Sequence, residues 1–458
     1  MLSKKTFALF VLMLSFTALL LAQELKRKAM LGVKLAPLTE EIKKTSKYTG
    51  EGVYVEAVNP KGSAGLLGLP SGAILQMING QTLKSRAELR SVLDKLREDN
   101  ELSLTYFFDN QTKTIVGKAL GKPVELHSNA NVHYDVVAYK DNLLRSILYT
   151  PKGIDSAPVV FYLQGYTCQS IEYPNKNPIK ELINGWISSG FAVYLVEKPG
   201  SGDSKSKIGC NDIDFHQEKL AFNNAYKSLL KNEFIDADNI FLFGHSMGGV
   251  TAPILANQKA PKGIITFGTV GKNWYEYMKD VFTEQQEIFG APKDRIAENA
   301  KQNIPFITDM MINKKSNIEM INNDVYKEYL TNQNLIDQLE KGYYLGRSYK
   351  FWGSLGEIDI PREWKSVNTN VLVMHGEFDI QAIHRRYAEM IVDMVNKNQG
   401  KAEFALLKNT DHVLLKFNSM QENIDTLNSG NYHNYMRDNF NPEVTEVSVK
   451  WMRALMIN

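Results

Sequence analysis

The sequence predicts an α/β protein with a mostly parallel sheet, preceded by a smaller domain of mixed strands and helices. Strand patterns alternate with helix patterns from about residue 131 onward, an order typical of parallel sheets covered by helices on both faces. One short apolar strand ends at Gly244, two residues before Ser246, and a helix pattern follows at once. Residues 23–120 have turn signals and short strands of their own. Together these observations indicate two folded domains.

The composition is that of a folded protein with room for a large core. The chain has 458 residues, of which 43% are apolar and 10% aromatic, and this length predicts more than one domain. Its formal net charge is +2, and residues 1–22 contain two lysines and no acid. The remainder is therefore close to neutral, which gives no indication of a nucleic-acid partner.

Residues 1–22 have the pattern of a secretory signal peptide. Lys4 and Lys5 precede an uncharged apolar run from Phe7 to Leu21, and polar sequence begins at Gln23. We therefore expect an exported protein, either periplasmic in a bacterium or secreted. An uncleaved membrane anchor is the alternative, and only in that case do we expect attachment to a membrane.

Residues 23–120 are expected to fold as one domain with a small core. Alternating or apolar runs predict strands, and a run with apolar residues on one face predicts a helix. The expected strands are 52–58, 72–78 and 102–108, and the expected helix is 85–97. Turn residues separate these elements at 59–62 and at Asn79–Gly80.

The order of these elements resembles a PDZ domain of the kind attached to bacterial envelope proteases. The matching segments are Leu31, Gly32 and Val33 as the carboxylate-binding loop and strand, 62–65 as a turn into a short helix, and Asn79–Gly80. The resemblance implies that the domain binds a C-terminal peptide by strand addition, with backbone N–H groups near Gly32 holding the carboxylate. Ala73 stands where the family usually has an acid. The alternative is a degenerate domain that serves only as a spacer.

Residues 121–130 have the polar composition of a linker, and 131–458 follow as the α/β domain. Apolar strand patterns alternate there with amphipathic helix patterns. The expected strands are 132–139, 143–149, 159–163, 191–196, 240–243, 263–268, 371–375 and 402–407, and the expected helices are 179–188, 215–230, 250–258, a helix from Ile380, and 443–455.

The alternation is suspended for about a hundred residues after Gly268, far longer than a connection normally is. Helical periodicity runs through 274–288, 294–313 and 324–341, and the segment is rich in aromatic residues. We expect a helical cap over the active site, at about residues 271–369. The alternative is a separate small domain away from the chemistry.

The segment Gly244-His245-Ser246-Met247-Gly248 lies between a predicted strand and a predicted helix. A strand, a Gly-x-Ser-x-Gly turn and a helix in this order form a nucleophile elbow. Glycines are needed there because the sharp turn brings backbone segments into contact. The N–H of Met247, at the start of the helix, is suited to hold a developing oxyanion. The alternative is a chance match of common residues.

A serine hydroxyl becomes a nucleophile when a base takes its proton and an acid orients that base. Asp379 follows the strand 371–375 and His412 follows the strand 402–407. Both are therefore expected at the sheet edge that carries Ser246, in the chain order Ser, Asp, His. The competing acids are Glu377 and Asp411, and the competing histidines are His375 and His384.

The second oxyanion donor is expected in the loop after the strand 159–163. Gly165 and Tyr166 lie there, and a flexible glycine followed by a free N–H fits the requirement. The Tyr166 side chain could instead serve only for packing.

Residues 131–458 resemble the α/β-hydrolases of the serine peptidase, esterase and lipase type with an inserted cap. The resemblance rests on four motifs: Gly244–Gly249, His375-Gly376-x-x-Asp379, Asp411–His412 and Gly200–Ser204. It implies that Ser246 is the nucleophile, His412 the base, Asp379 its orienting acid, and the amides of Tyr166 and Met247 the oxyanion donors, without metal or cofactor. Gln164 departs from the histidine that the family usually has before the glycine.

The two cysteines are Cys168 and Cys210. In an exported chain they could form a disulfide, and two buried free thiols are the alternative. Because the α/β-hydrolase fold brings the loops after adjacent strands to one edge, the resemblance implies a bridge that braces the oxyanion loop.

The expected activity is that of a serine hydrolase that cleaves an ester or amide bond through an acyl-enzyme at Ser246. The sequence does not distinguish a small ester or amide from a peptide, and acyl transfer to an acceptor other than water stays open. The alternative function is a PDZ-mediated peptide-binding protein with an inactive hydrolase scaffold.

Overall fold

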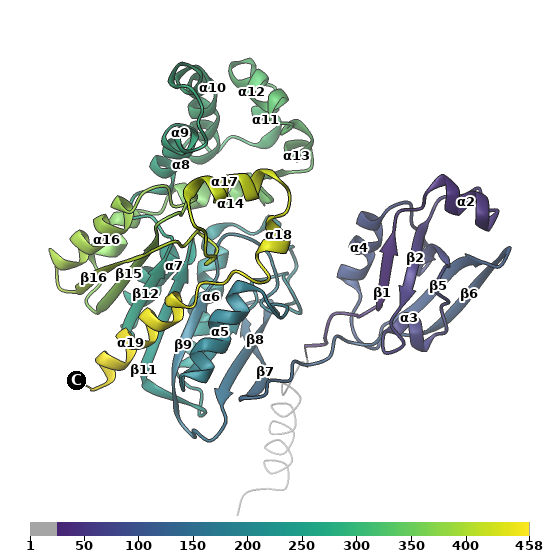
Figure 1. Cartoon of the computed structure of the whole chain (residues 1–458), viewed down its shortest axis with the longest axis horizontal. Coiled ribbons are helices and arrows are strands. Elements are labelled where there is room, and N and C mark those ends of the chain that lie inside the picture. The colour runs from purple at the N-terminus through teal and green to yellow at the C-terminus, as the bar shows by residue number, and fades with distance from the viewer. Residues whose placement is uncertain (1–24, 458) are drawn as a thin grey trace, which may run out of the picture. The chain divides into compact units, whose positions relative to one another are not determined.

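The computed structural model describes residues 25–457. The chain divides into two compact units, Met1–Glu125 and Leu126–Asn458 (Figure 1). This division falls inside the expected linker 121–130, and the expected signal peptide lies outside the described residues. No helix among the described residues is long and apolar enough to span a bilayer.

The N-terminal unit is an antiparallel sheet with three helices. The strand order is β1-β2-β3-β5-β6, so β1 is an edge strand, and β4 pairs with β3. The elements are β1 (Val33–Ala36), α2 (Glu40–Ser46), β2 (Val53–Val58), α3 (Ser63–Leu66), β3 (Ile74–Ile78), β4 (Gln81–Thr82), α4 (Arg86–Lys95), β5 (Glu101–Phe108) and β6 (Gln111–Lys118). Neither α2 nor β6 was expected, and α2 buries no residue while β6 is mostly exposed. Neither has the apolar periodicity that sequence reasoning detects.

The C-terminal unit contains an eight-stranded sheet in the order β16-β15-β12-β11-β9-β10-β8-β7. From β10 to β16 all neighbouring strands are parallel, whereas β8 is antiparallel to both of its neighbours. The strands are β7 (Ala130–Tyr139), β8 (Asn142–Pro151), β9 (Ala157–Leu163), β10 (Ala192–Val196), β11 (Ile235–His245), β12 (Gly263–Phe267), β15 (Asn370–Gly376) and β16 (Lys401–Leu407). The expected α/β class with a mostly parallel sheet is confirmed.

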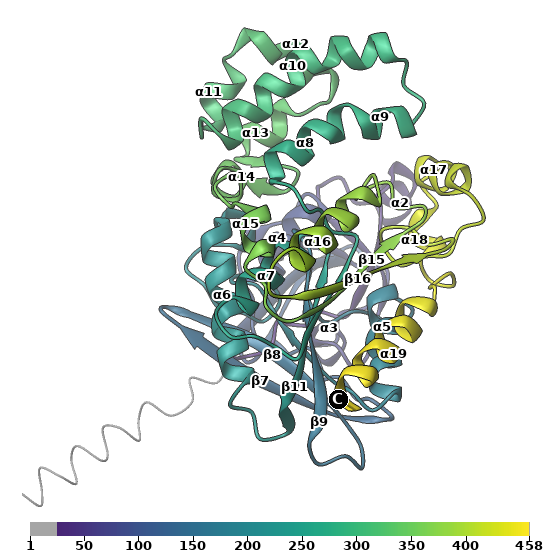
Figure 2. The same ribbon diagram turned by 90° about the vertical axis from the view of Figure 1, so that its left-hand side faces the viewer.

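Helices cover both faces of this sheet (Figure 2). Val159 and Phe161 of β9 pack on the side of α6, α7 and α16, while Val160 and Tyr162 pack on the side of α5 and α19. Alternate strand residues thus enter two separate cores, as in a sheet buried on both sides. The helices are α5 (Pro178–Ser188), α6 (Phe215–Leu229), α7 (Gly248–Ala256), α16 (Arg386–Asn396), α17 (Met420–Asn428), α18 (Tyr432–Tyr435) and α19 (Glu443–Ile457), with a short 3₁₀ turn η1 (Cys210–Asp212).

A helical insertion between β12 and β15 forms the cap, and its helices α8 to α13 stack beyond the ends of the strands (Figures 1 and 2). Its elements are α8 (Trp274–Phe282), α9 (Glu284–Ile288), α10 (Lys293–Met311), α11 (Asn317–Ile321), η2 (Asp324–Tyr326), α12 (Lys327–Asn332), α13 (Ile336–Glu340), β13 (Tyr343–Tyr344), β14 (Arg347–Ser348), α14 (Tyr349–Gly356) and α15 (Ile360–Lys365). The expected helices 274–288 and 324–341 are each broken into shorter ones.

The expectation of a helix from Ile380 was wrong, because α16 begins at Arg386. Residues 380–385 instead form a loop in which Ile383 has a φ of 57°. The N–H of Ala382 donates to Asp379 Oδ1 at 2.7 Å. The side chain of Asp379 therefore satisfies a backbone group that a helix would otherwise use, and the loop holds the acid in place.

Candidate active site

Ser246 lies on the sharp turn between β11 and α7, with a φ of 54°. Its N–H donates to Phe267 O of β12 at 2.9 Å, and its own carbonyl accepts from Gly249 N at 2.9 Å. A Cβ on Gly248 would lie 2.0 Å from Leu163 O. The turn thus requires a glycine beside the serine, and it keeps Ser246 in a strained backbone conformation that projects its side chain from the strand end.

The structure brings His412 and Asp379 into direct contact. His412 Nδ1 lies 3.0 and 2.9 Å from the two carboxylate oxygens of Asp379. Gly268 approaches both residues, since a Cβ there would lie 2.8 Å from Asp379 Oδ2 and from His412 Nδ1. Because Nδ1 is engaged by the carboxylate, Nε2 is the nitrogen of His412 that can act as a base.

Burial and the ion pair shift the pKa values of His412 and Asp379 in opposite directions. Burial lowers the pKa of His412, but the Asp379 carboxylate outweighs it and raises this pKa above 6.5. Burial raises the pKa of Asp379, but His412 outweighs it and lowers that pKa below 3.8. The carboxylate is therefore ionised at neutral pH and stabilises the imidazolium that forms when His412 accepts a proton.

The competing acids have other contacts. Asp411 Oδ1 accepts hydrogen bonds from Val413 N at 3.0 Å and Leu415 N at 2.7 Å, and Asp411 Oδ2 accepts one from the Tyr432 hydroxyl. Glu377 accepts from Asn409 N at 2.9 Å. Both acids shape the loop that carries His412, whereas Asp379 contacts the imidazole itself.

The competing histidines also have other surroundings. His384 Nε2 lies 2.8 Å from Glu284. His375 is buried in β15, and burial lowers its pKa. Neither one hydrogen-bonds Asp379 or lines the pocket that contains Ser246, whereas His412 does both.

His245 was not assigned a role from the sequence, yet it positions the base. Its Nε2 donates to the backbone oxygen of His412 at 2.8 Å, and its Nδ1 accepts from the Tyr162 hydroxyl at 3.0 Å. A backbone oxygen only accepts, so Nε2 must carry the hydrogen. Burial lowers the pKa of His245 to about 4, which keeps it neutral. Only its place beside Ser246 in the motif could have drawn attention to it.

The loop after β9 lies against Ser246. A Cβ on Gly165 would lie 3.4 Å from Ser246 Cβ, and Tyr166 lines the pocket that contains Ser246. Met247 lies buried at the beginning of α7. The side chain of Gln164 donates to Val196 O at 3.1 Å, so it ties the loop to β10. Tyr166 and Met247, the expected oxyanion donors, thus lie in the pocket of Ser246 and next to it in the chain, respectively.

Cys168 of this loop is joined to Cys210 of η1 by a disulfide, with an S–S distance of 2.06 Å and a Cα–Cα distance of 5.8 Å. Both Cys168 O and Glu197 Oε2 accept from Ser201 Oγ, at 3.1 Å each. The bridge therefore links the loop after β9 to the loop after β10. Two free thiols, the alternative weighed for these cysteines, are not what the structure contains.

The cap closes over a pocket of about 130 Å³ that both Ser246 and His412 line. Trp274, Tyr277 and Trp352 of the insertion form part of its wall. The insertion is therefore part of the candidate active site and not a domain remote from it. Apart from His412, the described lining residues are uncharged.

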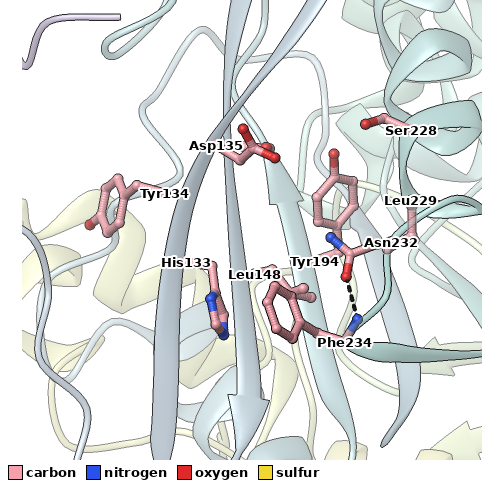
Figure 3. A pocket seen from close by; sticks show the side chains of 10 residues that line it. His133, Tyr134, Asp135, Leu148, Tyr194, Ser228, Leu229, Asn232 and Phe234 are labelled. Carbon is pink, nitrogen blue, oxygen red and sulfur yellow. Dashed lines mark hydrogen bonds between the residues drawn. The ribbon is translucent and has the colours of Figure 1, made fainter. Parts of the chain in front are cut away.

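A separate cavity of about 260 Å³ lies among β7, β8, β10 and the end of α6 (Figure 3). It too contains a serine, a histidine and an aspartate, namely Ser228, His133 and Asp135. However, His133 Nε2 bonds Thr150 Oγ1 at 2.9 Å, and Figure 3 shows Ser228 and His133 at opposite ends of the cavity. This cavity lacks the acid–base contact that His412 makes.

In the N-terminal unit, a groove of about 810 Å³ runs between β1 and α4. Val33 lines it, Leu31 is buried beneath it, and Gly32 has a φ of 76°. A Cβ on Gly32 would lie 2.8 Å from Gly62 Cα, so only glycine fits there. Among the described residues, no group of three or more His, Cys, Asp or Glu could hold a metal ion.

Comparison with known proteins shows likenesses to a family model and to solved structures. A family model described as serine aminopeptidase, S33, matches residues 177–416, a little over half of the chain. The solved structure of Est1E from Butyrivibrio proteoclasticus is 11% identical, with 72% of this chain and 100% of that chain covered and a TM-score of 0.42. The proline iminopeptidase of Mycobacterium smegmatis is 12% identical, with 70% and 98% covered and a TM-score of 0.40.

One curated relative also matches. A probable periplasmic serine protease of Haemophilus influenzae, described as do/HhoA-like, is 32% identical over 90 residues, which are 19% of either chain. This chain therefore spans about a fifth of the length of that relative.

Proposed function

This chain belongs to the family described as serine aminopeptidase, S33, and has the α/β-hydrolase fold; from that premise we propose that it is an exported serine hydrolase. It cleaves an ester or amide bond through an acyl-enzyme at Ser246. The observation that carries the proposal is the contact of His412 with Asp379 at the pocket that Ser246 and His412 share.

In the proposed reaction, Ser246 Oγ attacks the carbonyl carbon while His412 Nε2 takes the hydroxyl proton. The amides of Tyr166 and Met247 hold the oxyanion. His412 then gives the proton to the leaving alcohol or amine, and the acyl group stays on Ser246. Water then attacks the acyl-enzyme while His412 takes its proton, and His412 gives that proton to Ser246 Oγ as the bond to the acyl group breaks and the acid leaves.

A fluorophosphonate probe tests this proposal, because it reacts with activated serines. We expect labelling of the folded protein at Ser246. Absence of labelling would favour the alternative, an inactive scaffold that binds peptides. Export is supported by the pattern of residues 1–22 and by the Cys168–Cys210 bridge, since disulfides persist in oxidising compartments. The same probe applied to cell fractions locates the active protein, and a label confined to the cytosol would contradict export.

The pocket favours an uncharged acyl group over a free amino terminus. Its described lining contains no Asp or Glu that could pair with an ammonium group. Two acids of the cap helices are already paired, Asp280 with Lys272 at 2.5 Å and Glu284 with Arg386. Burying an ammonium group without a partner costs several kcal/mol. We therefore propose an acyl esterase or amidase specificity, in contrast to the aminopeptidase activity in the family description.

A matched pair of substrates tests this specificity: the 4-nitrophenyl esters of propionic acid and of alanine, which differ by the α-ammonium group. We expect kcat/KM to be at least about 100-fold higher for the propionyl ester, because each 1.4 kcal/mol of desolvation cost corresponds to a factor of ten. We also expect butyryl to exceed dodecanoyl esters, since a cavity of about this size holds a group comparable to benzene. Hydrolysis by Ser246→Ala serves as the background. A preference for the alanyl ester would restore the aminopeptidase interpretation.

We further propose that the N-terminal unit binds the C-terminus of an acidic peptide in the groove between β1 and α4. The carbonyl oxygens of residues 30–32 accept from N–H groups of residues 59–64. Because the peptide group is planar and trans, the N–H groups of Leu31, Gly32 and Val33 point away from that segment. They are suited to hold a terminal carboxylate, while the edge of β1 adds a strand.

The charges along the groove support an acidic ligand. Its lining includes four basic residues and one acid: Lys28, Arg86, Arg90, Lys122 and Asp94. Lys28 Nζ pairs with Asp94 at 2.9 Å, which leaves a net positive charge along the groove. Opposite charge attracts an acidic peptide and speeds its association.

Fluorescence anisotropy of the full chain with labelled hexapeptides tests this binding. We expect an acidic peptide with a free C-terminus to bind more tightly than its amide or a basic peptide. Arg90→Glu should weaken binding by about fivefold to tenfold, and added salt should reduce the effect. Lys95→Glu is the control, because it makes the same charge change on α4 outside the groove lining. Equal binding of the acid and the amide would contradict the proposal.

A further inference from the structure

Three charged side chains form a buried cluster beside the loop that follows β9. Lys198, Glu218 and Arg347 are 0%, 2% and 1% exposed. Lys198 Nζ lies 2.8 Å from Glu218 Oε1, and Arg347 Nη2 lies 2.9 Å from Glu218 Oε2. The three residues come from the segment after β10, from α6 and from β14 of the cap. With two cations and one carboxylate, the cluster has a net positive charge.

Both cations also hold the carbonyl groups of the loop. Lys198 Nζ donates to Gly165 O at 2.6 Å, and Arg347 Nη1 donates to Tyr166 O at 2.6 Å. Gly165 C=O and Tyr166 N–H belong to one peptide group, and in a trans peptide they point in opposite directions. The Tyr166 N–H therefore points away from Lys198.

The sheet places Lys198 and Ser246 on opposite sides of this loop. β9 lies between β10 and β11 and is parallel to both. Lys198 follows the end of β10, and Ser246 follows the end of β11. A peptide group that offers its oxygen to Lys198 thus directs its N–H toward the side of the nucleophile.

We propose that Lys198 is a positioning residue that orients and polarises the Gly165–Tyr166 peptide, so that the Tyr166 N–H becomes a stronger donor to the oxyanion. This inference rests on the proposed hydrolase function. Charge-assisted hydrogen bonds are the strong ones, and a bond at one end of a peptide group strengthens the bond at its other end. Glu218 keeps Lys198 in place, and Arg347 joins the cap to the same loop.

The surplus positive charge also suits the reaction. Negative charge develops on the substrate oxygen in the transition state, and the low dielectric of a buried site strengthens its attraction to nearby cations. The cluster is fixed before the substrate arrives, so its charge acts without reorganisation at the moment of reaction. The effect is therefore expected in kcat and not in KM.

The charge on Lys198 should make kcat depend on pH. Burial, together with Arg347, lowers the pKa of Lys198 to about 8, while Glu218 opposes the shift. Arg347 of β14 and Glu218 of α6 are the charged groups that face Lys198. The neighbouring Glu197, whose pKa burial raises to about 7, contacts Ser170 and Ser201 instead. As pH rises through about 8, the ammonium charge is lost, and kcat should fall.

The deprotonation of Lys198 does not itself destabilise the fold. Between pH 8 and the ordinary lysine pKa of 10.5, the unfolded chain binds more protons at Lys198 than the folded one. The contribution of Lys198 to the free energy of unfolding therefore increases with pH in that window. The thermal midpoint, measured at each pH, separates a loss of the ammonium charge from a loss of the fold.

The test compares kcat and KM of the full chain, its Lys198→Met and Lys198→Arg variants, and a control, Lys180→Met, on an uncharged 4-nitrophenyl ester. Lys180 is also buried and contacts the Tyr149 hydroxyl at 3.3 Å, away from the pocket. We expect Lys198→Met to lower kcat by about 10- to 100-fold, less than the loss of a whole oxyanion donor. KM should change by less than about threefold. Lys180→Met should retain the wild-type kcat.

The pH profiles of the wild type and of Lys198→Arg complete the test. We expect wild-type kcat to decline near pH 8 and Lys198→Arg to lack this decline, since arginine stays charged. A kcat of Lys198→Met within about threefold of the wild-type value, an equal loss in Lys180→Met and Lys198→Met, or an alkaline decline of the same size in Lys198→Arg would overturn the inference. If the wild type is not labelled by fluorophosphonate, the proposed function itself fails, so the two failures are distinct.

Discussion

Replacement of Ser246 by alanine is expected to lower kcat by about 10⁶-fold and to abolish fluorophosphonate labelling, because the nucleophile of a triad acts as a unit with its base. Alanine keeps the Cβ of serine, so the backbone strain at a φ of 54° is unchanged, and the fold should be retained. Initial rates on a 4-nitrophenyl ester, together with the thermal midpoint, measure the two effects separately. A residual rate of about 10³-fold over water is expected from the oxyanion donors.

Ser228→Ala is the matched control for this variant. Ser228 lines the other cavity, which also contains a histidine and an aspartate. Activity and labelling should equal those of the wild type. If Ser228→Ala lost the label and Ser246→Ala kept it, the catalytic centre would have to be assigned to the second cavity.

Asp379→Asn is expected to lower kcat by about 10⁴-fold with little change in the fold. Because the N–H of Ala382 donates to Oδ1, the amide nitrogen of the variant takes the place of Oδ2 and donates to His412 Nδ1, so the imidazole is no longer held in the tautomer that leaves Nε2 free. The pH at which kcat is half-maximal on the acid side gives a second measurement. This pH should be above 6.5 in the wild type, since Asp379 raises the pKa of His412. In the variant it should be lower.

Asp411→Asn tests whether Asp411, and not Asp379, is the acid that orients His412. Asp411 is equally buried, and burial raises its pKa to about 6. Its oxygens hold backbone groups and the Tyr432 hydroxyl. We expect kcat to stay within about tenfold of the wild type. A loss as large as that of Asp379→Asn would mean that Asp411 is the acid that orients His412.

Much of the fold could be predicted because the central strands of the C-terminal sheet are buried on both faces. β9 and β10 are runs of apolar residues, and such runs are recognisable without knowing their partners. β6 and α2 were missed because they bury little. The loop 380–385 was mistaken for a helix because its apolar residues, Ile380, Ala382 and Ile383, are buried without forming a helix.

By itself the sequence determined the elbow at Ser246 and the order in which the acid and base candidates follow it. These are local properties, since turn geometry and strand ends depend on neighbouring residues. Only the tertiary structure decided that Asp379, and not Asp411 or Glu377, contacts His412. It alone brought positions 198, 218 and 347 together beside the loop after β9. The physical reason is that such contacts depend on how distant loops close over the sheet, which periodicity along the chain does not encode.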